Sequence, residues 1–158
     1  LIKLTFSNFH KPPYNISPKN HSLRNDEHEL DPKGGRALLN LGHTFAHAIE
    51  AVAGYGQYLH GEAVAIGLVC AFRLSQKLGF CEYDLESQLL GLLQRYNLPT
   101  RLKESMSVRQ LLDSMSNDKK VQKGNLRFII MKEIGDSFIE QAVDLKYVIN
   151  VLETIGAE

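Results

Sequence analysis

The sequence has no excess of either charge sign: its 158 residues include 18 Lys plus Arg and 18 Asp plus Glu. A chain without net charge has no overall field to draw it to the phosphates of a nucleic acid or to an anionic membrane surface. We therefore expect binding to neither nucleic acid nor membrane. The material for a hydrophobic core is present, since 44% of the residues are hydrophobic, and the length suits one domain.

Cysteine is scarce and long apolar runs are missing. The two cysteines, Cys70 and Cys81, do not form a CxxC pair, so we expect neither a disulfide scaffold nor a thiolate metal site, and a cytoplasmic location fits. No stretch approaches the ~18 apolar residues that cross a bilayer, and the N-terminus does not follow a signal-peptide pattern. Because the chain begins with Leu1 rather than Met, we expect it to be a fragment or a processed product.

The first 33 residues differ in character from the rest. The stretch at residues 11–18 reads KPPYNISP, which cannot sustain a helix, because proline removes a backbone donor and restricts the residue before it. His, Asn, Ser and charged residues dominate up to Glu29. We predict an extended or partly disordered lead over residues 1–33, followed by one helical domain over residues 34–158.

Hydrophobic spacing and helix breakers predict a mainly α fold. Residues 37–53 and 62–78 carry apolar side chains at three- and four-residue steps, the spacing of one helix face, and a glycine follows each. The second of these is apolar nearly all round over residues 63–72, which predicts a buried central helix. Three further helices are expected, over residues 85–96, 107–115 and 144–155.

A small β-hairpin should precede the last helix. Residues 126–131 and 137–142 are short and rich in β-branched or aromatic side chains. The sequence Glu-Ile-Gly-Asp at residues 133–136 lies between them and is typical of a turn. The expected domain is therefore multihelical with one hairpin.

Three of the six histidines fall close together in the sequence, at His43, His47 and His60. Positions 43 and 47 lie on one face of a helix, with Cβ atoms about 5–6 Å apart, and a helix–turn–helix would return His60 toward them. Neutral imidazoles gathered in this way can form a zinc site. The alternative is that the rings bond to carbonyls or cap the turn. Glu50 and Glu62 are nearby carboxylates, for which a solvated position on a helix is the commoner case.

Three separated motifs resemble the 3-dehydroquinate synthase family of sugar phosphate cyclases. The first is RALLNLGHTFAHAIE at residues 36–50, and the second is GYGQYLHGEAVA at residues 54–65. The third is DKKV at residues 118–121, with Gly124 and RFI at residues 127–129. Their order and separation agree with the C-terminal, multihelical domain of that family, from about Asp26 onward.

The resemblance implies roles for individual residues. Zinc (or cobalt) would be held by His43 and His60, together with a glutamate of the family pattern that this sequence does not show. The catalytic histidine, which lies at the substrate and helps handle phosphate and proton transfers, falls on His47. Arg36 and Asn40 match positions that contact substrate anions, as suits the forked donors of arginine.

The resemblance also implies substrate contacts by lysines, and a set of partners. Either Lys119 or Lys120 matches a substrate-contacting lysine, and Lys19 stands where the family has another. Without the resemblance, helix capping would explain Arg36 and Asn40, and a solvated loop would explain the lysines. The implied partners are an anionic sugar phosphate, a missing N-terminal half that binds NAD, and a second copy in a homodimer.

The implied reaction is that of a carbon–oxygen lyase of the shikimate pathway, which leads to the aromatic amino acids. It converts 3-deoxy-arabino-heptulosonate 7-phosphate to 3-dehydroquinate with loss of phosphate, using NAD catalytically and zinc as a Lewis acid. The sequence departs from the family in having Ala46 where glycine is usual, an insertion at residues 31–34 and no Gly-rich nucleotide cradle. We therefore expect the isolated chain to be inactive.

The sequence is also compatible with two other functional interpretations. One is a different sugar phosphate cyclase or, more remotely, a metal-dependent polyol dehydrogenase of the same two-half layout. The other is a truncated helical remnant without catalysis, which the missing glutamate and the unusual first 33 residues favour.

Overall fold

A computed structural model describes residues 35–81, 84–117 and 126–158. The predicted lead over residues 1–33 lies outside the described residues, and so do Lys19, Lys119 and Lys120. The elements in chain order are η1 (Gly35–Asn40), α1 (His43–Ala53), α2 (His60–Lys77), α3 (Asp84–Arg95), α4 (Val108–Asn117), β1 (Phe128–Glu133), β2 (Asp136–Glu140) and α5 (Leu145–Thr154). The expected class, mainly helical with one hairpin, is confirmed.

The first predicted helix is wrong at its N-terminal end. We expected one helix over residues 37–53, but residues 35–40 form a 3₁₀ turn and α1 begins only at His43. The break is at Gly42, whose φ of +79° is a left-handed conformation that interrupts the helix. Gly54, with φ of +86°, ends α1 as predicted.

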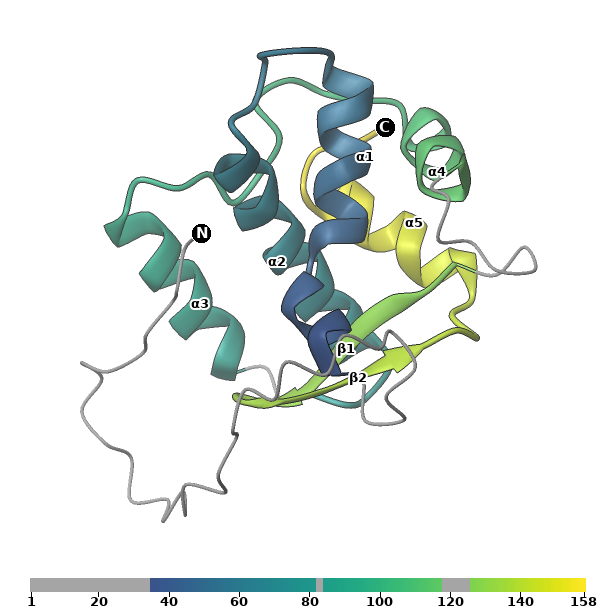
Figure 1. The fold of residues 1–158 in the computed structure, drawn as a ribbon. Helices are drawn as coiled ribbons and strands as arrows, with labels where there is room; N and C mark the ends of the chain where they lie inside the picture. The colour runs from purple at the N-terminus through teal and green to yellow at the C-terminus, as the bar shows by residue number, and fades with distance from the viewer. Residues whose placement is uncertain (1–34, 82–83, 118–125) are drawn as a thin grey trace.

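The second helix, α2, is the centre of the domain. It passes between α1, α3, α5 and the hairpin, and it contacts each of them (Figure 1). Eleven of its residues are buried, from Ala63 to Gln76. This confirms the buried central helix that the continuous apolar character of residues 63–72 predicted.

The hairpin is antiparallel and docks on α2 through a buried serine. Its register pairs Phe128 with Glu140 and Ile130 with Phe138. Ser75 of α2 is fully buried, and its Oγ donates to the carbonyl of Ala71 (2.7 Å) and accepts from the backbone N–H of Met131 (2.9 Å). The serine therefore satisfies a strand donor that would otherwise be buried without a partner.

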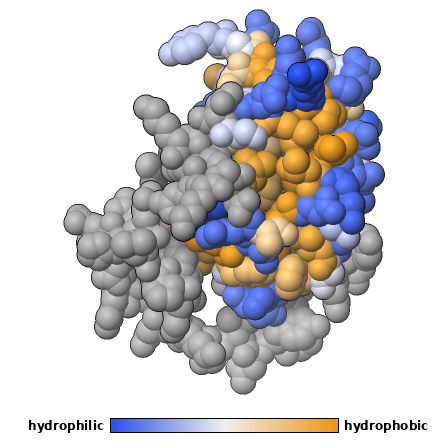
Figure 2. Space-filling model, turned by 90° about the vertical axis from the view of Figure 1, so that its right-hand side faces the viewer, coloured by the Kyte–Doolittle hydropathy of each residue, from blue (hydrophilic) through white to orange (hydrophobic). Residues whose placement is uncertain are grey.

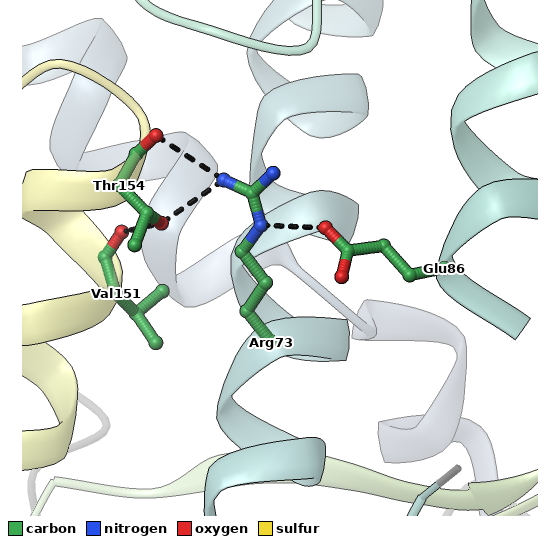
Figure 3. A network of polar contacts seen from close by, with 4 residues as sticks. All are labelled: Arg73, Glu86, Val151 and Thr154. Atoms are coloured by element: carbon green, nitrogen blue, oxygen red, sulfur yellow. Dashed lines mark hydrogen bonds and ion pairs between the residues drawn. The ribbon is translucent and has the colours of Figure 1, made fainter. Parts of the chain in front are cut away.

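An arginine joins three helices at another part of α2. Figure 3 shows Arg73 between Glu86 of α3 and the C-terminal end of α5. Its Nε donates to Glu86 Oε1 (2.8 Å), and its Nη1 donates to the carbonyl (3.2 Å) and the hydroxyl (3.0 Å) of Thr154. A cation at the last turn of α5 also suits the negative end of that helix dipole.

The surface carries apolar as well as polar side chains. Figure 2 shows apolar side chains gathered on the side of the molecule where α4 lies, with polar ones around them. Apolar faces of this kind often mark contacts with other proteins. In the described part of the chain, none of the helices has the length and apolar character needed to cross a membrane.

Candidate functional site

Three imidazole rings meet where the N-terminal end of α2 lies against α1. His43 and His47 lie one turn apart on α1, and their ring centroids are 5.7 Å apart. The ring of His60, the first residue of α2, lies 5.5 Å from that of His43 and 6.3 Å from that of His47. The structure thus brings together the three histidines that sequence spacing selected.

Two glycines set how α1 crosses α2. A Cβ on Gly67 would overlap the carbonyl oxygen of Gly42, and a Cβ on Gly42 would lie 2.6 Å from the carbonyl carbon of Gly67. Only backbone without side chains can approach this closely. Because Gly42 directly precedes His43, this crossing positions the first histidine. Ala46 is fully buried in the same crossing.

The Nδ1 atoms of His43 and His60 each face a hydrogen-bond acceptor. His43 Nδ1 is 3.3 Å from the carbonyl of Leu41, and His60 Nδ1 is 3.1 Å from Glu50 Oε1. An acceptor at Nδ1 stabilises the tautomer that carries its proton there, which leaves the Nε2 lone pair available. Metal-binding histidines commonly have this arrangement, because the outer partner fixes both the tautomer and the ring orientation.

The two nearby carboxylates have different partners. Glu62 Oε2 accepts from the backbone N–H of Leu59 (2.9 Å), at the start of α2, and from Lys103 Nζ (2.8 Å). The bond from Lys103, followed by that from Leu59, lowers the pKa of Glu62. Glu62 therefore caps α2, whereas Glu50 contacts a histidine of the cluster.

The fold changes the proton affinity of His43. Burial lowers the pKa of His43 below 6.5, and the neighbouring His47 and His60 lower it further, while the carbonyl of Leu41 opposes the shift. A lowered pKa keeps the imidazole neutral near pH 7. Neutral imidazole is the form that binds a metal ion.

Two of the three histidines could hold a metal ion only together with a ligand from outside the cluster. Within residues 35–81, 84–117 and 126–158, no three His, Cys, Asp or Glu side chains are arranged to hold a metal ion by themselves. Catalytic zinc commonly takes three protein ligands. Two histidines of this cluster with their Nε2 atoms available would supply two of the three.

The third sequence motif ends against α1. Thr44, beside His43, donates to the carbonyl of Arg127 (3.3 Å), and Phe45 packs against Phe128 with ring centroids 5.4 Å apart. Motifs that are separated by some 80 positions therefore come together at the start of α1. Asn40 lies exposed in η1, and Arg36 belongs to the same turn.

One residue of this region was missed by sequence reasoning. The sequence favours a solvated position for Glu50, but its carboxylate reaches His60 across the α1–α2 contact. The available signal was its spacing: it follows His43 by seven positions and His47 by three, so it lies on their helix face.

Comparison with known proteins agrees with this architecture. Residues 14–121 match the family profile described as 3-dehydroquinate synthase C-terminal. The chain is 45% identical over 132 residues to a 3-dehydroquinate synthase of Opitutus terrae, covering 84% of this chain and 37% of the relative. A 3-dehydroquinate synthase of Coxiella burnetii is 42% identical over 125 residues, covering 79% of this chain and 35% of that protein.

Two solved structures share the fold of this chain. The 2-epi-5-epi-valiolone synthase of Streptomyces hygroscopicus, with NAD⁺ and Zn²⁺ bound, aligns with a TM-score of 0.65 and 22% identity over 74% of this chain and 32% of its own. A 2-deoxy-scyllo-inosose synthase, complexed with carbaglucose-6-phosphate, NAD⁺ and Co²⁺, aligns with a TM-score of 0.67 and 21% identity over 78% of this chain and 36% of its own.

The chain spans about a third of the length of the two 3-dehydroquinate synthases named above, 37% and 35% respectively. Within that span, the family profile covers well over half of the chain, and the helical fold with its hairpin agrees with the solved relatives. The chain therefore belongs to the 3-dehydroquinate synthase family and corresponds to its C-terminal domain.

Proposed function

We propose that this chain is the zinc- and substrate-binding part of a 3-dehydroquinate synthase. The observation that carries the proposal is the meeting of His43, His47 and His60 within 5.5–6.3 Å at the α1–α2 contact. Family membership supplies the reaction, which is the phosphate-eliminating cyclisation of 3-deoxy-arabino-heptulosonate 7-phosphate. The parent enzyme would be a carbon–oxygen lyase of the shikimate pathway.

In this proposal His43 and His60 hold the metal ion. Bound zinc would act as a Lewis acid that polarises a substrate hydroxyl or carbonyl. The burial that lowers the pKa of His43 supports its role, because it disfavours competition by protons.

The remaining predicted residues would bind and orient the anionic substrate. His47 stands beside both proposed ligands, where an imidazole can accept or return a proton of the substrate. Arg36 and Asn40 precede α1 in η1, and the arginine fork suits a phosphate or carboxylate. Lys19, Lys119 and Lys120 remain proposed substrate contacts from the sequence resemblance alone.

Residues beyond this chain would complete the enzyme. Because the chain covers about a third of its relatives, we propose that the other part supplies NAD binding and the third zinc ligand. The apolar face in Figure 2 supports contact with another protein surface, either that part or a second copy in a homodimer. The pathway assignment predicts a cytoplasmic enzyme.

Zinc binding tests the proposal directly. Calorimetric titration near pH 7.5 should show one saturable site in the chain, and the His43→Ala/His60→Ala variant should lose it. Binding should be weaker than in a three-ligand protein site, because solvent completes the coordination. Thr44→Ser is the matched control, since it keeps the hydroxyl that bonds to the carbonyl of Arg127, and it should bind zinc like the parent chain.

Equal zinc uptake by the parent and the double variant would defeat the metal assignment. If the site is present, the catalytic assignment is tested next by adding a separately expressed nucleotide-binding half of a 3-dehydroquinate synthase. Substrate-dependent phosphate release that is lost on His47→Ala is the expected result. No release despite intact zinc binding would favour the inactive remnant.

A further inference from the structure

We infer that Glu50 is a positioning residue, which holds His60 in the tautomer and orientation that a metal ion requires. The inference rests on the proposed function, in which His60 is a zinc ligand. None of the residue roles that the family resemblance implies falls on this glutamate. It follows from one contact between two helices that lie side by side.

The geometry is that of a carboxylate behind a histidine. Both oxygens of Glu50 lie within reach of His60 Nδ1, Oε1 at 3.1 Å and Oε2 at 3.3 Å. An ionised carboxylate has no proton to donate, so the bond requires the proton to be on Nδ1. With Nδ1 protonated, the lone pair of a neutral His60 is on Nε2, and this is the atom that can bind zinc.

The position of Glu50 on α1 gives the contact a second effect. Glu50 belongs to the same helix as His43, whereas His60 begins the next helix. The contact with Glu50 therefore fixes the ring of His60 relative to that of His43, the other proposed ligand. The centroids of the two rings are 5.5 Å apart. His43 has its own outer acceptor in the carbonyl of Leu41, so both proposed ligands have the same tautomer stabilised by different means.

A role in stability alone does not explain this contact. The side chain of His60 is 59% exposed and that of Glu50 is 31% exposed. Exposed pairs of this kind contribute little to folding, because solvent screens them and ordering two side chains has an entropic cost. The contact should therefore matter much more for metal affinity than for thermal stability, and the two effects can be measured separately.

The experiment compares Glu50→Ala and Glu50→Gln with the parent chain by zinc titration and by thermal unfolding without metal. Glu153→Ala removes an exposed carboxylate from α5 and is the matched control. We expect Glu50→Ala to lose about 10- to 100-fold in zinc affinity, the usual effect of removing such an outer partner. Glu50→Gln keeps an acceptor oxygen and should recover part of the loss, while Glu153→Ala should bind like the parent chain.

Glutamine also separates positioning from direct ligation. If Glu50 bound the metal itself, the neutral amide would be a poor replacement and Glu50→Gln would lose as much affinity as Glu50→Ala. That result would overturn the positioning role, and so would parent-like affinity in Glu50→Ala. A loss of affinity that is matched by global unfolding of the metal-free variant would overturn it as well.

Tautomer measurement keeps the test independent of zinc binding. In long-range ¹H–¹⁵N spectra of the metal-free chain at pH 7.5, His60 should carry its proton on Nδ1, and this preference should be lost in Glu50→Ala. An Nε2–H tautomer in the parent chain would overturn the inference even if zinc binds. A parent chain with the Nδ1–H tautomer but no saturable zinc site would instead refute the proposed function.

Discussion

Gly67→Ala sets two effects on stability against each other: the higher helix propensity of alanine and the loss of the close contact between α1 and α2. Gly67 lies inside α2, where alanine is intrinsically better than glycine by about 1 kcal/mol. The new Cβ would overlap the carbonyl oxygen of Gly42 and would lie 3.1 Å from its carbonyl carbon and 3.2 Å from the backbone nitrogen of Ala46. These atoms belong to the backbone, which cannot rotate away as a long side chain does.

The expected magnitude follows from these opposing effects. Overpacking of a tight core costs about 1–3 kcal/mol. We take the upper value, about 3 kcal/mol, for Gly67→Ala, because the atoms that the new Cβ meets belong to the backbone. Subtracting the gain in propensity, about 1 kcal/mol, leaves a loss of roughly 2 kcal/mol in the free energy of unfolding. For a chain of this size, about 2–4 °C per kcal/mol, the melting temperature should fall by roughly 4–8 °C.

Gly91→Ala provides the matched control for the thermal unfolding assay. Gly91 is also inside a helix, but a Cβ there would meet no atom within 4 Å, so the variant should be more stable than the parent by about 1 kcal/mol. The overlap in Gly67→Ala should also push α1 away from α2 and so weaken zinc binding. Gly91→Ala, which creates no overlap, should bind zinc like the parent chain. A Gly67→Ala variant that is as stable as Gly91→Ala would refute the close crossing.

Three further predictions concern the core and the histidines. Ser75→Ala should lower the free energy of unfolding by about 1–3 kcal/mol, because it leaves a buried strand N–H without its acceptor. Ser116→Ala removes an exposed hydrogen bond and should change the free energy of unfolding by less than about 0.5 kcal/mol. Equal effects of the two substitutions in denaturant unfolding would contradict this prediction. Arg73→Met should cost about 2 kcal/mol through its charged hydrogen bonds, and unchanged stability in the same assay would show that they contribute nothing. NMR titration of the metal-free chain should give a pKa for His43 below 6.5. The contribution of His43 to the free energy of unfolding is then complete above pH 6.5 and decreases as the pH falls toward the folded-state pKa. A measured pKa at or above 6.5 would contradict the burial argument.

Local chemistry was sufficient to predict most elements of the fold. Alternating three- and four-residue spacing predicted α1 through its C-terminal end at Gly54, and the continuous apolar run predicted that α2 is buried. The turn around Gly135 predicted the hairpin, and Asp144 does begin α5, where its side chain accepts from the N–H of Lys146 (2.9 Å). These features depend on neighbours within a few positions, which a sequence displays directly.

The start of α1 could not be predicted in the same way. The periodic residues before Gly42 favour a continuing helix, and glycine by itself is tolerated inside one. The break exists because Gly42 adopts a left-handed conformation where its backbone meets that of Gly67, 25 positions later. A contact between two distant glycines has no signature in either local stretch.

For the site, sequence alone determined the family motifs and the pairing of His43 with His47, since a spacing of four is one helical turn. The tertiary structure decided how close the ring of His60 comes, which carboxylate meets it and which one caps α2. Glu50 and Glu62 are equally plausible partners by sequence distance, ten and two positions from His60. Glu50 contacts the ring because α1 folds back against α2, whereas Glu62 turns to the N–H of Leu59 and to Lys103, since the first turn of α2 needs an acceptor there.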